Sequence, residues 1–508
     1  MKMAETSRKR KFALNTITSI INQLLLIISG FLIPRAMLSS YGSEINGLIS
    51  SITQFLGFIS FMQAGVGVVV QAALYKPLSE HNSEGISKIY SSAQKFFRTI
   101  AIVFVFYSIA ISIIYPCITN TVYSRTYIAA LVIAISINLF AQYFFGLTNS
   151  LLLNADQRAY VPLIFQSVVT VLNVLITVSL IYLNYSVLIV KLVSNIVCLI
   201  NPLGLTWYVK KNYDINTHIR YEDEPIRQKW SGFAQHISAV IVDNTDIIVL
   251  TLFSSLANVS VYYVYYIVVN ALKQLLTSMT GGVQALFGDM LAKNEINQLK
   301  KVFSNFEIVF SYVTTLLYTC ALCLIVNFVK VYTKGINDVN YIVPFFAMLI
   351  TLAYAMYCYR TIYYTLIKAA GHFRETQFGA ILEVILNVVI SVISVIKFGL
   401  VGVAIGTLIA VSYRTLYCVW YLSLHIINRD RKMFFKNIIS NLVVFLICYI
   451  LTRNFEMMSI SYIAWIINAI ETAVISVIVL TIVYCIVYWK DLKSIINFID
   501  NYLKKVRG

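Results

Sequence analysis

The feature that most constrains this chain is a succession of long apolar segments, separated by short stretches that carry most of its charged residues. A helix needs roughly 20 mostly apolar residues to cross a lipid bilayer. Fourteen segments meet this requirement: 12–33, 45–75, 99–119, 126–152, 160–182, 187–209, 231–253, 259–290, 303–328, 342–367, 377–396, 400–425, 437–453 and 459–488. The pattern predicts an all-α polytopic membrane protein with about 14 transmembrane helices, of which 45–75 and 259–290 are long enough to tilt or to extend beyond the lipid.

Composition supports a lipid environment. Hydrophobic residues make up 59% of the chain and charged residues 12%, whereas soluble domains have about 45–50% and about 25%. The net charge of +17 does not indicate a nucleic-acid partner, because the basic residues form short clusters and no nucleic-acid-binding module is recognisable. We expect these clusters to face the anionic lipids of the membrane.

The distribution of basic residues predicts the orientation. If the N-terminus is cytoplasmic, 29 of the 39 Lys and Arg residues fall in cytoplasmic segments and six in outer loops, as the positive-inside rule requires. The segment 12–33 follows five basic residues, but it is too long for a signal-peptide core, so we expect a retained helix. Both termini are then cytoplasmic, and residues 490–508 read as an amphipathic tail at the membrane surface.

The chain resembles itself at an offset near 213 residues. Residues 171–178 (VLNVLITV) match 385–392 (ILNVVISV), 88–92 match 301–305, and 41–43 match 253–255. Parallel repeats of this kind are common in transporters. We predict an N-terminal six-helix lobe at 1–209, a cytoplasmic loop at 210–230, a C-terminal six-helix lobe at 231–428, two further helices within 429–489, and the tail at 490–508.

Polar and charged side chains within the apolar segments mark candidate sites. Polar residues recur at spacings of three and four in several segments, which places them along one helix face. They either join helices by hydrogen bonds or line a water-filled cavity, and stripes on five segments favour the cavity. Intramembrane charges are costly and usually functional. The predicted substrate-binding set is Arg35, Lys273, Arg360, Arg414, Asn22, Gln54, Asn173 and Gln274. Tyrosines around Arg360 suit a sugar route.

A second set of residues suggests coupling to an ion gradient. His236, Asp243 and Asp246 lie along one face of segment 231–253, and Glu383 lies within 377–396. Two neighbouring carboxylates in a low-dielectric site do not both ionise easily, so one could exchange a proton or bind sodium. The alternative is that an aspartate simply neutralises Lys273. No cofactor is expected beyond a coupling H⁺ or Na⁺.

No enzyme motif is recognisable: GxxxxGK[ST], HExxH and GxSxG are absent from the sequence, so we expect a transporter without a nucleotide-binding domain. Cys320 and Cys323 form a CxxC without a second ligand pair, which we interpret as apolar packing rather than a metal or redox site.

Several motifs together resemble the Wzx-type polysaccharide flippase family. They are Asn15-Thr-Ile-Thr, Leu32-Ile-Pro-Arg-Ala-Met, Tyr41-Gly-Ser-Glu-Ile-Asn-Gly, Gln63-Ala-Gly-Val-Gly, Leu153-Asn-Ala-Asp-Gln-Arg-Ala-Tyr160 and Gly399-Leu-Val-Gly-Val-Ala-Ile-Gly406. The resemblance covers nearly the whole chain. It implies a two-lobe carrier with alternating access, which moves an undecaprenyl-pyrophosphate-linked oligosaccharide across a bacterial plasma membrane.

The resemblance also implies partners: the lipid-linked oligosaccharide, membrane lipids, and a polysaccharide polymerase with its chain-length regulator. The wider superfamily includes multidrug exporters and lipid II flippases, so a multidrug or cation antiporter is the main alternative. A membrane scaffold or a polymerase subunit is a further alternative, which the duplicated helix plan disfavours.

Overall fold

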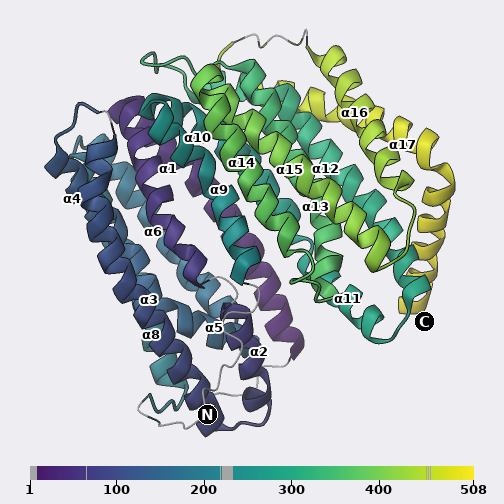
Figure 1. The fold of residues 1–508 in the computed structure, drawn as a ribbon, viewed down its shortest axis with the longest axis horizontal. Helices are drawn as coiled ribbons and strands as arrows, with labels where there is room; N and C mark the ends of the chain where they lie inside the picture. The colour runs from purple at the N-terminus through teal and green to yellow at the C-terminus, as the bar shows by residue number, and fades with distance from the viewer. Residues whose placement is uncertain are drawn as a thin grey trace. The chain divides into compact units, whose positions relative to one another are not determined.

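The computed structural model describes residues 8–63, 66–119, 121–217, 219, 233–453, 455, 457 and 459–507, and this part of the chain is helical, without strands (Figure 1). The elements are α1 Arg8–Gly57, η1 Phe58–Gln63, α2 Val66–Ser79, α3 Ser83–Ile118, α4 Arg125–Ala141, η2 Gln142–Gly146, α5 Leu147–Ala155, α6 Tyr160–Tyr182, α7 Val187–Cys198, α8 Ile200–Asn212, α9 Phe233–Phe253, α10 Leu256–Ser278, α11 Gly281–Ala292, α12 Ile296–Tyr332, α13 Pro344–Ala369, α14 Gln377–Phe398, α15 Leu400–His425, α16 Lys432–Thr452 and α17 Tyr462–Arg507.

Many of the helices are long and apolar enough to cross a membrane, as the sequence pattern predicts. Within the described residues, 12 segments are long and apolar enough to cross a membrane. One of them, Ala13–Met62, contains a break at Gly42, where φ is 82° and ψ is 178°. The predicted segments 12–33 and 45–75 both overlap this span, and the predicted segment 231–253 corresponds to α9, which is not among the twelve. The protein is therefore an all-α, multi-pass membrane protein.

Some predicted helix boundaries differ from the structure. The segment 45–75 is not one tilted helix, because the second arm of α1 ends at Gly57 and is followed by η1 and α2. Likewise, 259–290 is divided into α10 and α11. Hydropathy does not reveal these breaks, since the residues on both sides of each break are apolar.

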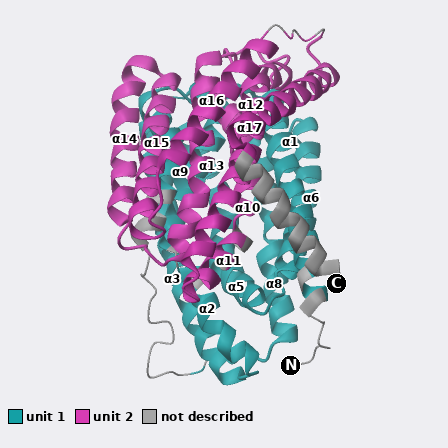
Figure 2. Ribbon diagram, turned by 90° about the vertical axis from the view of Figure 1, so that its right-hand side faces the viewer, with its two compact units in different colours: residues 1–260 teal, residues 261–508 magenta. Residues whose placement is uncertain are grey.

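The described chain forms two compact units, residues 1–260 and 261–508 (Figure 2). In unit 1, α1 packs against α6 and α9, and α3 packs against α4. In unit 2, α15 packs against α13 and α14, while α12 packs against α13, α16 and α17. The predicted lobe limits at 209 and 231 stay a prediction.

The two units share an order of elements. In unit 1 the second arm of α1 and the short α2 precede α3, which has 36 residues. In the second half of the chain α10 and the short α11 precede α12, which has 37 residues. This parallel is consistent with the duplication seen in the sequence, and α16 and α17 have no counterpart in it.

Candidate functional site

Four of the predicted site residues come together inside unit 2. Arg360 belongs to α13, Glu383 to α14 and Arg414 to α15, and Lys273 lies on α10. Each of the four residues is less than one tenth exposed. Buried charges in a membrane protein are costly unless they have partners or a function.

Glu383 lies between the two arginines. Its Oε1 accepts a hydrogen bond of 2.6 Å from Nη1 of Arg360, and its Oε2 lies 3.7 Å from Nε of Arg414. Arg414 also donates through Nη1 to the backbone carbonyl of Thr376 over 3.0 Å. Two guanidinium groups therefore share a single carboxylate, which leaves an excess of positive charge within this trio.

Close packing of α14 on α15 makes this arrangement possible. A Cβ at Gly379 would lie 2.4 Å from Nη1 of Arg414, and a Cβ at Gly406 would lie 2.2 Å from Oγ of Ser391. A Cβ at Gly402 would meet the backbone of Ser394 at 2.3 Å. Small residues let helix backbones approach closely, and the absent side chain of Gly379 leaves the space that Arg414 occupies.

Aromatic rings extend the site beyond the arginines. The Tyr357 ring has Nζ of Lys273 at 4.3 Å and Cζ of Arg360 at 4.5 Å from its centroid. Cζ of Arg414 lies 5.3 Å from the centroid of the Tyr417 ring. Cations at these distances are attracted by the negative face of the ring. The cluster thus combines three cations, one carboxylate and two tyrosines, a chemistry suited to an anion such as a phosphate.

Several predicted residues of unit 1 join helices to one another. Asn22 donates from Nδ2 to Oε1 of Gln166 over 3.3 Å and accepts from Ser167 over 3.1 Å, which links α1 to α6. Asn173 accepts from Ser194 over 2.7 Å, which links α6 to α7. These contacts match the alternative in which polar residues hold helices together. Arg35 and Gln54 are half-buried on the two arms of α1.

The predicted coupling residues of α9 differ in burial. Asp246 is 5% exposed, whereas Asp243 is exposed. Asn244 and Thr245 donate to the carbonyls of Val240 and Ile241 in their own helix, both over 2.6 Å. The side chain of His236 lies outside the described residues. Gln274 is exposed on α10, and the ion-coupling role of these residues stays a prediction.

The motif at 153–160 has a structural role in unit 1. The carboxylate of Asp156 lies 3.6 Å from Nζ of Lys11 and 2.9 Å from Nε of Arg158, and it accepts a hydrogen bond of 2.5 Å from the Tyr213 hydroxyl. Burial, with the neighbouring carboxylate, raises the pKa of the Tyr213 phenol well above its usual value. The tyrosine therefore stays a hydrogen-bond donor, and the motif joins the ends of α1, α5 and α8.

Sequence reasoning missed a second buried ion pair in unit 2, between Glu307 of α12 and Arg429. Glu307 lies near the start of the predicted segment 303–328, and its position inside an apolar segment was the signal that could have identified it. Among the described residues, no group of three or more His, Cys, Asp and Glu side chains could hold a metal ion. Cys320 and Cys323 are free thiols.

Comparisons with known proteins identify the fold. No protein-family model and no curated protein matches the sequence. A structure of the lipid II flippase MurJ in an inward closed conformation has a TM-score of 0.72 at 15% identity, covering 94% of this chain and 99% of that chain. An inward-facing MATE multidrug transporter of the MOP superfamily has a TM-score of 0.62 at 14% identity, covering 78% of this chain and 93% of that chain. The eukaryotic MATE transporter AtDTX14 has a TM-score of 0.59 at 13% identity, covering 84% of this chain and 98% of that chain. The chain therefore shares its fold with these transporters.

Proposed function

We propose that this chain is a flippase that moves undecaprenyl-pyrophosphate-linked oligosaccharide units across a bacterial plasma membrane by alternating access. The observation that carries the proposal is the buried pair Arg360 and Arg414 around the single carboxylate of Glu383. A pyrophosphate brings several negative oxygens, and guanidinium groups bind such oxygens through paired, charge-assisted hydrogen bonds. Tyr357 and Tyr417 add ring faces and hydroxyls that suit a sugar.

An apolar groove in unit 2 supports a substrate that has a lipid tail. The groove has a volume of about 670 Å³ and lies between α16 and α17. Lys432 and Lys436 line it at the start of α16, and Ile439, Val443 and Val483 line it further along. A charged head with an apolar tail fits such a surface better than a compact soluble molecule does.

The remaining parts of the proposal concern energy, orientation and partners. A proton or sodium gradient would drive the cycle through Asp243, Asp246 and His236 on α9, with Glu383 as a further group that could change its charge. Both termini would lie in the cytoplasm. A polysaccharide polymerase and a chain-length regulator would take over the translocated units.

A multidrug or cation antiporter is the second candidate, because MATE transporters share the fold. Such a carrier needs acidic and aromatic surfaces to hold cationic drugs. The arginines of unit 2 repel a cation, and this disfavours the second candidate.

Transport in proteoliposomes tests the proposal. The purified chain is reconstituted with an undecaprenyl-pyrophosphate-linked oligosaccharide that carries a fluorescent sugar, and an external glycosidase reports which leaflet holds the lipid. We expect rapid movement by the wild type, a loss of at least tenfold in Arg360→Gln, and poor rescue by Arg360→Lys because lysine lacks the planar fork. Lys301→Gln, which replaces an exposed residue on α12, is the control and should move the lipid at the wild-type rate.

Two results would contradict the proposal. One is movement of the lipid-linked glycan by Arg360→Gln at the wild-type rate. The other is a wild-type protein that moves no lipid-linked glycan and exports ethidium instead, which would favour the antiporter.

A further inference from the structure

A fully buried carboxylate contacts α13 about one turn from Arg360, which belongs to the cationic site formed by Lys273, Arg360 and Arg414. Glu307 of α12 is 2% exposed. Its Oε2 lies 2.6 Å from Nη1 of Arg429 in the linker between α15 and α16. Its Oε1 accepts hydrogen bonds from Nδ2 of Asn437 over 2.8 Å and from the hydroxyl of Tyr363. Two hydrogen-bond donors and one guanidinium group, from three separate segments, therefore surround one carboxylate.

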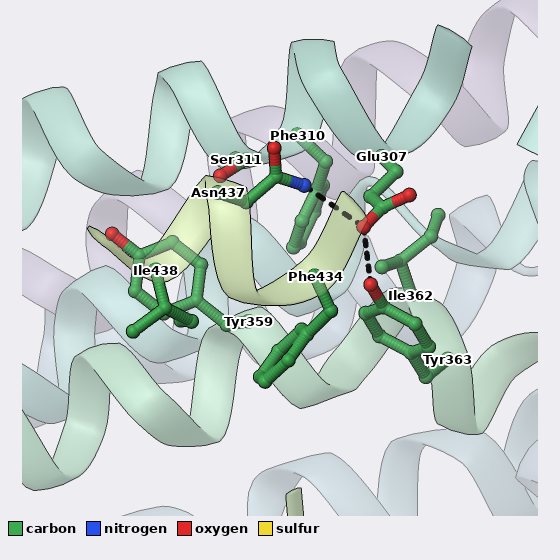
Figure 3. A pocket seen from close by; sticks show the side chains of 9 residues that line it. All are labelled: Glu307, Phe310, Ser311, Tyr359, Ile362, Tyr363, Phe434, Asn437 and Ile438. Carbon is green, nitrogen blue, oxygen red and sulfur yellow. Dashed lines mark hydrogen bonds between the residues drawn. The ribbon is translucent and has the colours of Figure 1, made fainter. Parts of the chain in front are cut away.

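Figure 3 shows Asn437 and Tyr363 directed at the same oxygen of Glu307, from α16 and α13 respectively. The adjoining cavity, which Ser311 and Tyr359 also line, is about 10 Å³. That volume is close to the smallest that holds a single water molecule. The carboxylate is therefore closely packed, and a substitution of Glu307 must alter the packing of the helices around it.

The hydrogen-bond network around Glu307 continues from α16 to α17. Asn437 accepts through Oδ1 from the hydroxyl of Tyr488, and at Tyr488 α17 departs from helical geometry, with φ of −119° and ψ of 22°. Lys436 donates from Nζ to the carbonyl of Val487 over 2.8 Å, and this Nζ lies 4.5 Å from the centroid of the Tyr488 ring. The first turns of α16 thus hold the bend of α17 and the carboxylate of α12 together.

α13 connects this network with the cationic site. Tyr359 and Tyr363, four residues apart, face α12 and α16: Tyr359 shares a hydrogen bond of 2.8 Å with Thr315, and Tyr363 donates to Glu307. Tyr357 and Arg360, three residues apart, belong to the cationic site, where Arg360 contacts the Tyr357 ring and Glu383. Because a helix moves as a rigid rod over one or two turns, the contact that fixes Tyr363 also fixes Arg360.

We propose that Glu307 is a positioning residue that couples α16 and α17 to the cationic site. Bound by Arg429, Tyr363 and Asn437, the carboxylate holds α13 at the rotation and depth at which Arg360 meets Glu383. Without the carboxylate, α13 shifts and Arg360 loses its place. The inference rests on the proposed function for its consequence in transport, and on the geometry alone for the movement of α13.

The first test reads the position of α13 without any substrate. Cys358 of α13 is fully buried and its sulfur lies 3.4 Å from the Tyr318 hydroxyl of α12. In a full-length variant that retains only Cys358 and Cys198, maleimide labelling in mild detergent is followed at each cysteine by mass spectrometry. We expect Glu307→Gln to accelerate labelling of Cys358 at least fivefold, while labelling of Cys198 in unit 1 stays unchanged.

Charge removal on both sides provides the matched comparison. Glu307→Gln leaves the half-buried Arg429 without its carboxylate. Glu307→Gln with Arg429→Met removes both charges, so maleimide should label Cys358 more slowly in the double variant than in the single one. Glu295→Gln, an exposed carboxyl at the start of α12, is the control. If Glu307→Gln does not fold, Glu307→Asp, which keeps the charge and shortens its reach, should show a smaller acceleration.

The second test measures binding of undecaprenyl pyrophosphate, used as the probe, to the solubilised chain. We expect Glu307→Gln to weaken binding of the probe about tenfold, although Glu307 does not itself belong to the cationic site. The double variant Glu307→Gln with Arg429→Met should recover part of the affinity. Glu295→Gln should bind the probe as the wild type does. A folded Glu307→Gln with wild-type labelling and wild-type binding overturns the inference. A wild type that does not bind the probe contradicts the proposed function, and the Cys358 labelling still decides the coupling.

Discussion

Replacing Glu383 by glutamine removes the carboxylate that lies between two buried guanidinium groups. The side chains of Arg360, Glu383 and Arg414 are 10%, 7% and 3% exposed, so water screens them weakly. Glutamine keeps the volume and one acceptor oxygen, and the substitution therefore changes charge with little change in packing. Both arginines stay buried in the folded protein without a carboxylate partner from α14.

The magnitude follows from the geometry. Two opposite charges about 4 Å apart attract by about 4 kcal/mol at an effective dielectric constant of 20. Loss of one member of a buried ion pair destabilises proteins by about 3–5 kcal/mol, because the remaining charge stays desolvated. We expect Glu383→Gln to lie in that range. Arg360→Gln should cost less, since Glu383 keeps Arg414 at 3.7 Å.

The assay is equilibrium unfolding by urea in mild detergent, followed by tryptophan fluorescence. The combination of Glu383→Gln with Arg360→Gln should be less destabilising than the sum of the single changes, because the double variant retains only one uncompensated arginine. Glu295→Gln is the control for loss of an exposed carboxyl and should stay within about 0.5 kcal/mol of the wild type. A folded Glu383→Gln that loses less than about 1 kcal/mol would refute the reasoning.

Three further predictions concern topology, coupling and packing. A cysteine at Asn216, in a cysteine-free background, should resist impermeant thiol reagents in intact cells, and ready labelling from outside would overturn the predicted orientation. Asp243→Asn combined with Asp246→Asn should abolish the dependence of transport on the ion gradient, and undiminished ion dependence would end the coupling hypothesis. Gly406→Leu should destabilise the protein by about 1–3 kcal/mol, because a Cβ there would lie 2.2 Å from a serine hydroxyl of α14. Gly30→Leu, where nothing lies within 4 Å, should be tolerated, and urea unfolding of the two variants compares them.

The partners of buried side chains are what the sequence predicts least well. Helical spacing correctly suggests that Tyr357 and Arg360 share one face of their helix, as their joint position at the cationic site shows. It cannot indicate which side chain of another helix lies opposite. The sequence suggested Asp243 or Asp246 as the partner of Lys273, which stays a prediction, and the structure adds Tyr357 to the surroundings of Lys273. Glu383, predicted as a coupling residue, contacts both arginines.

The polar stripes illustrate the same limit. Asn22 and Asn173 are predicted to bind substrate, which stays a prediction, and in the structure both form hydrogen bonds to a neighbouring helix. A stripe shows that a helix face avoids lipid. Whether water or a second helix satisfies that face depends on how the helices are arranged, which no local pattern contains.

The sequence by itself determined that this chain is an all-α, multi-pass membrane protein. A backbone that crosses lipid must satisfy its hydrogen bonds internally, and apolar segments of about 20 residues do so as helices. Each such segment can be recognised without knowledge of its neighbours. Only the tertiary structure decided which charges meet. The trio around Glu383 and the ion pair of Glu307 with Arg429 each join residues from different helices and loops. These contacts form because the packing of small residues and of helix ends brings separate segments close together. The packing depends on residues throughout the fold, so no single segment of the sequence predicts it.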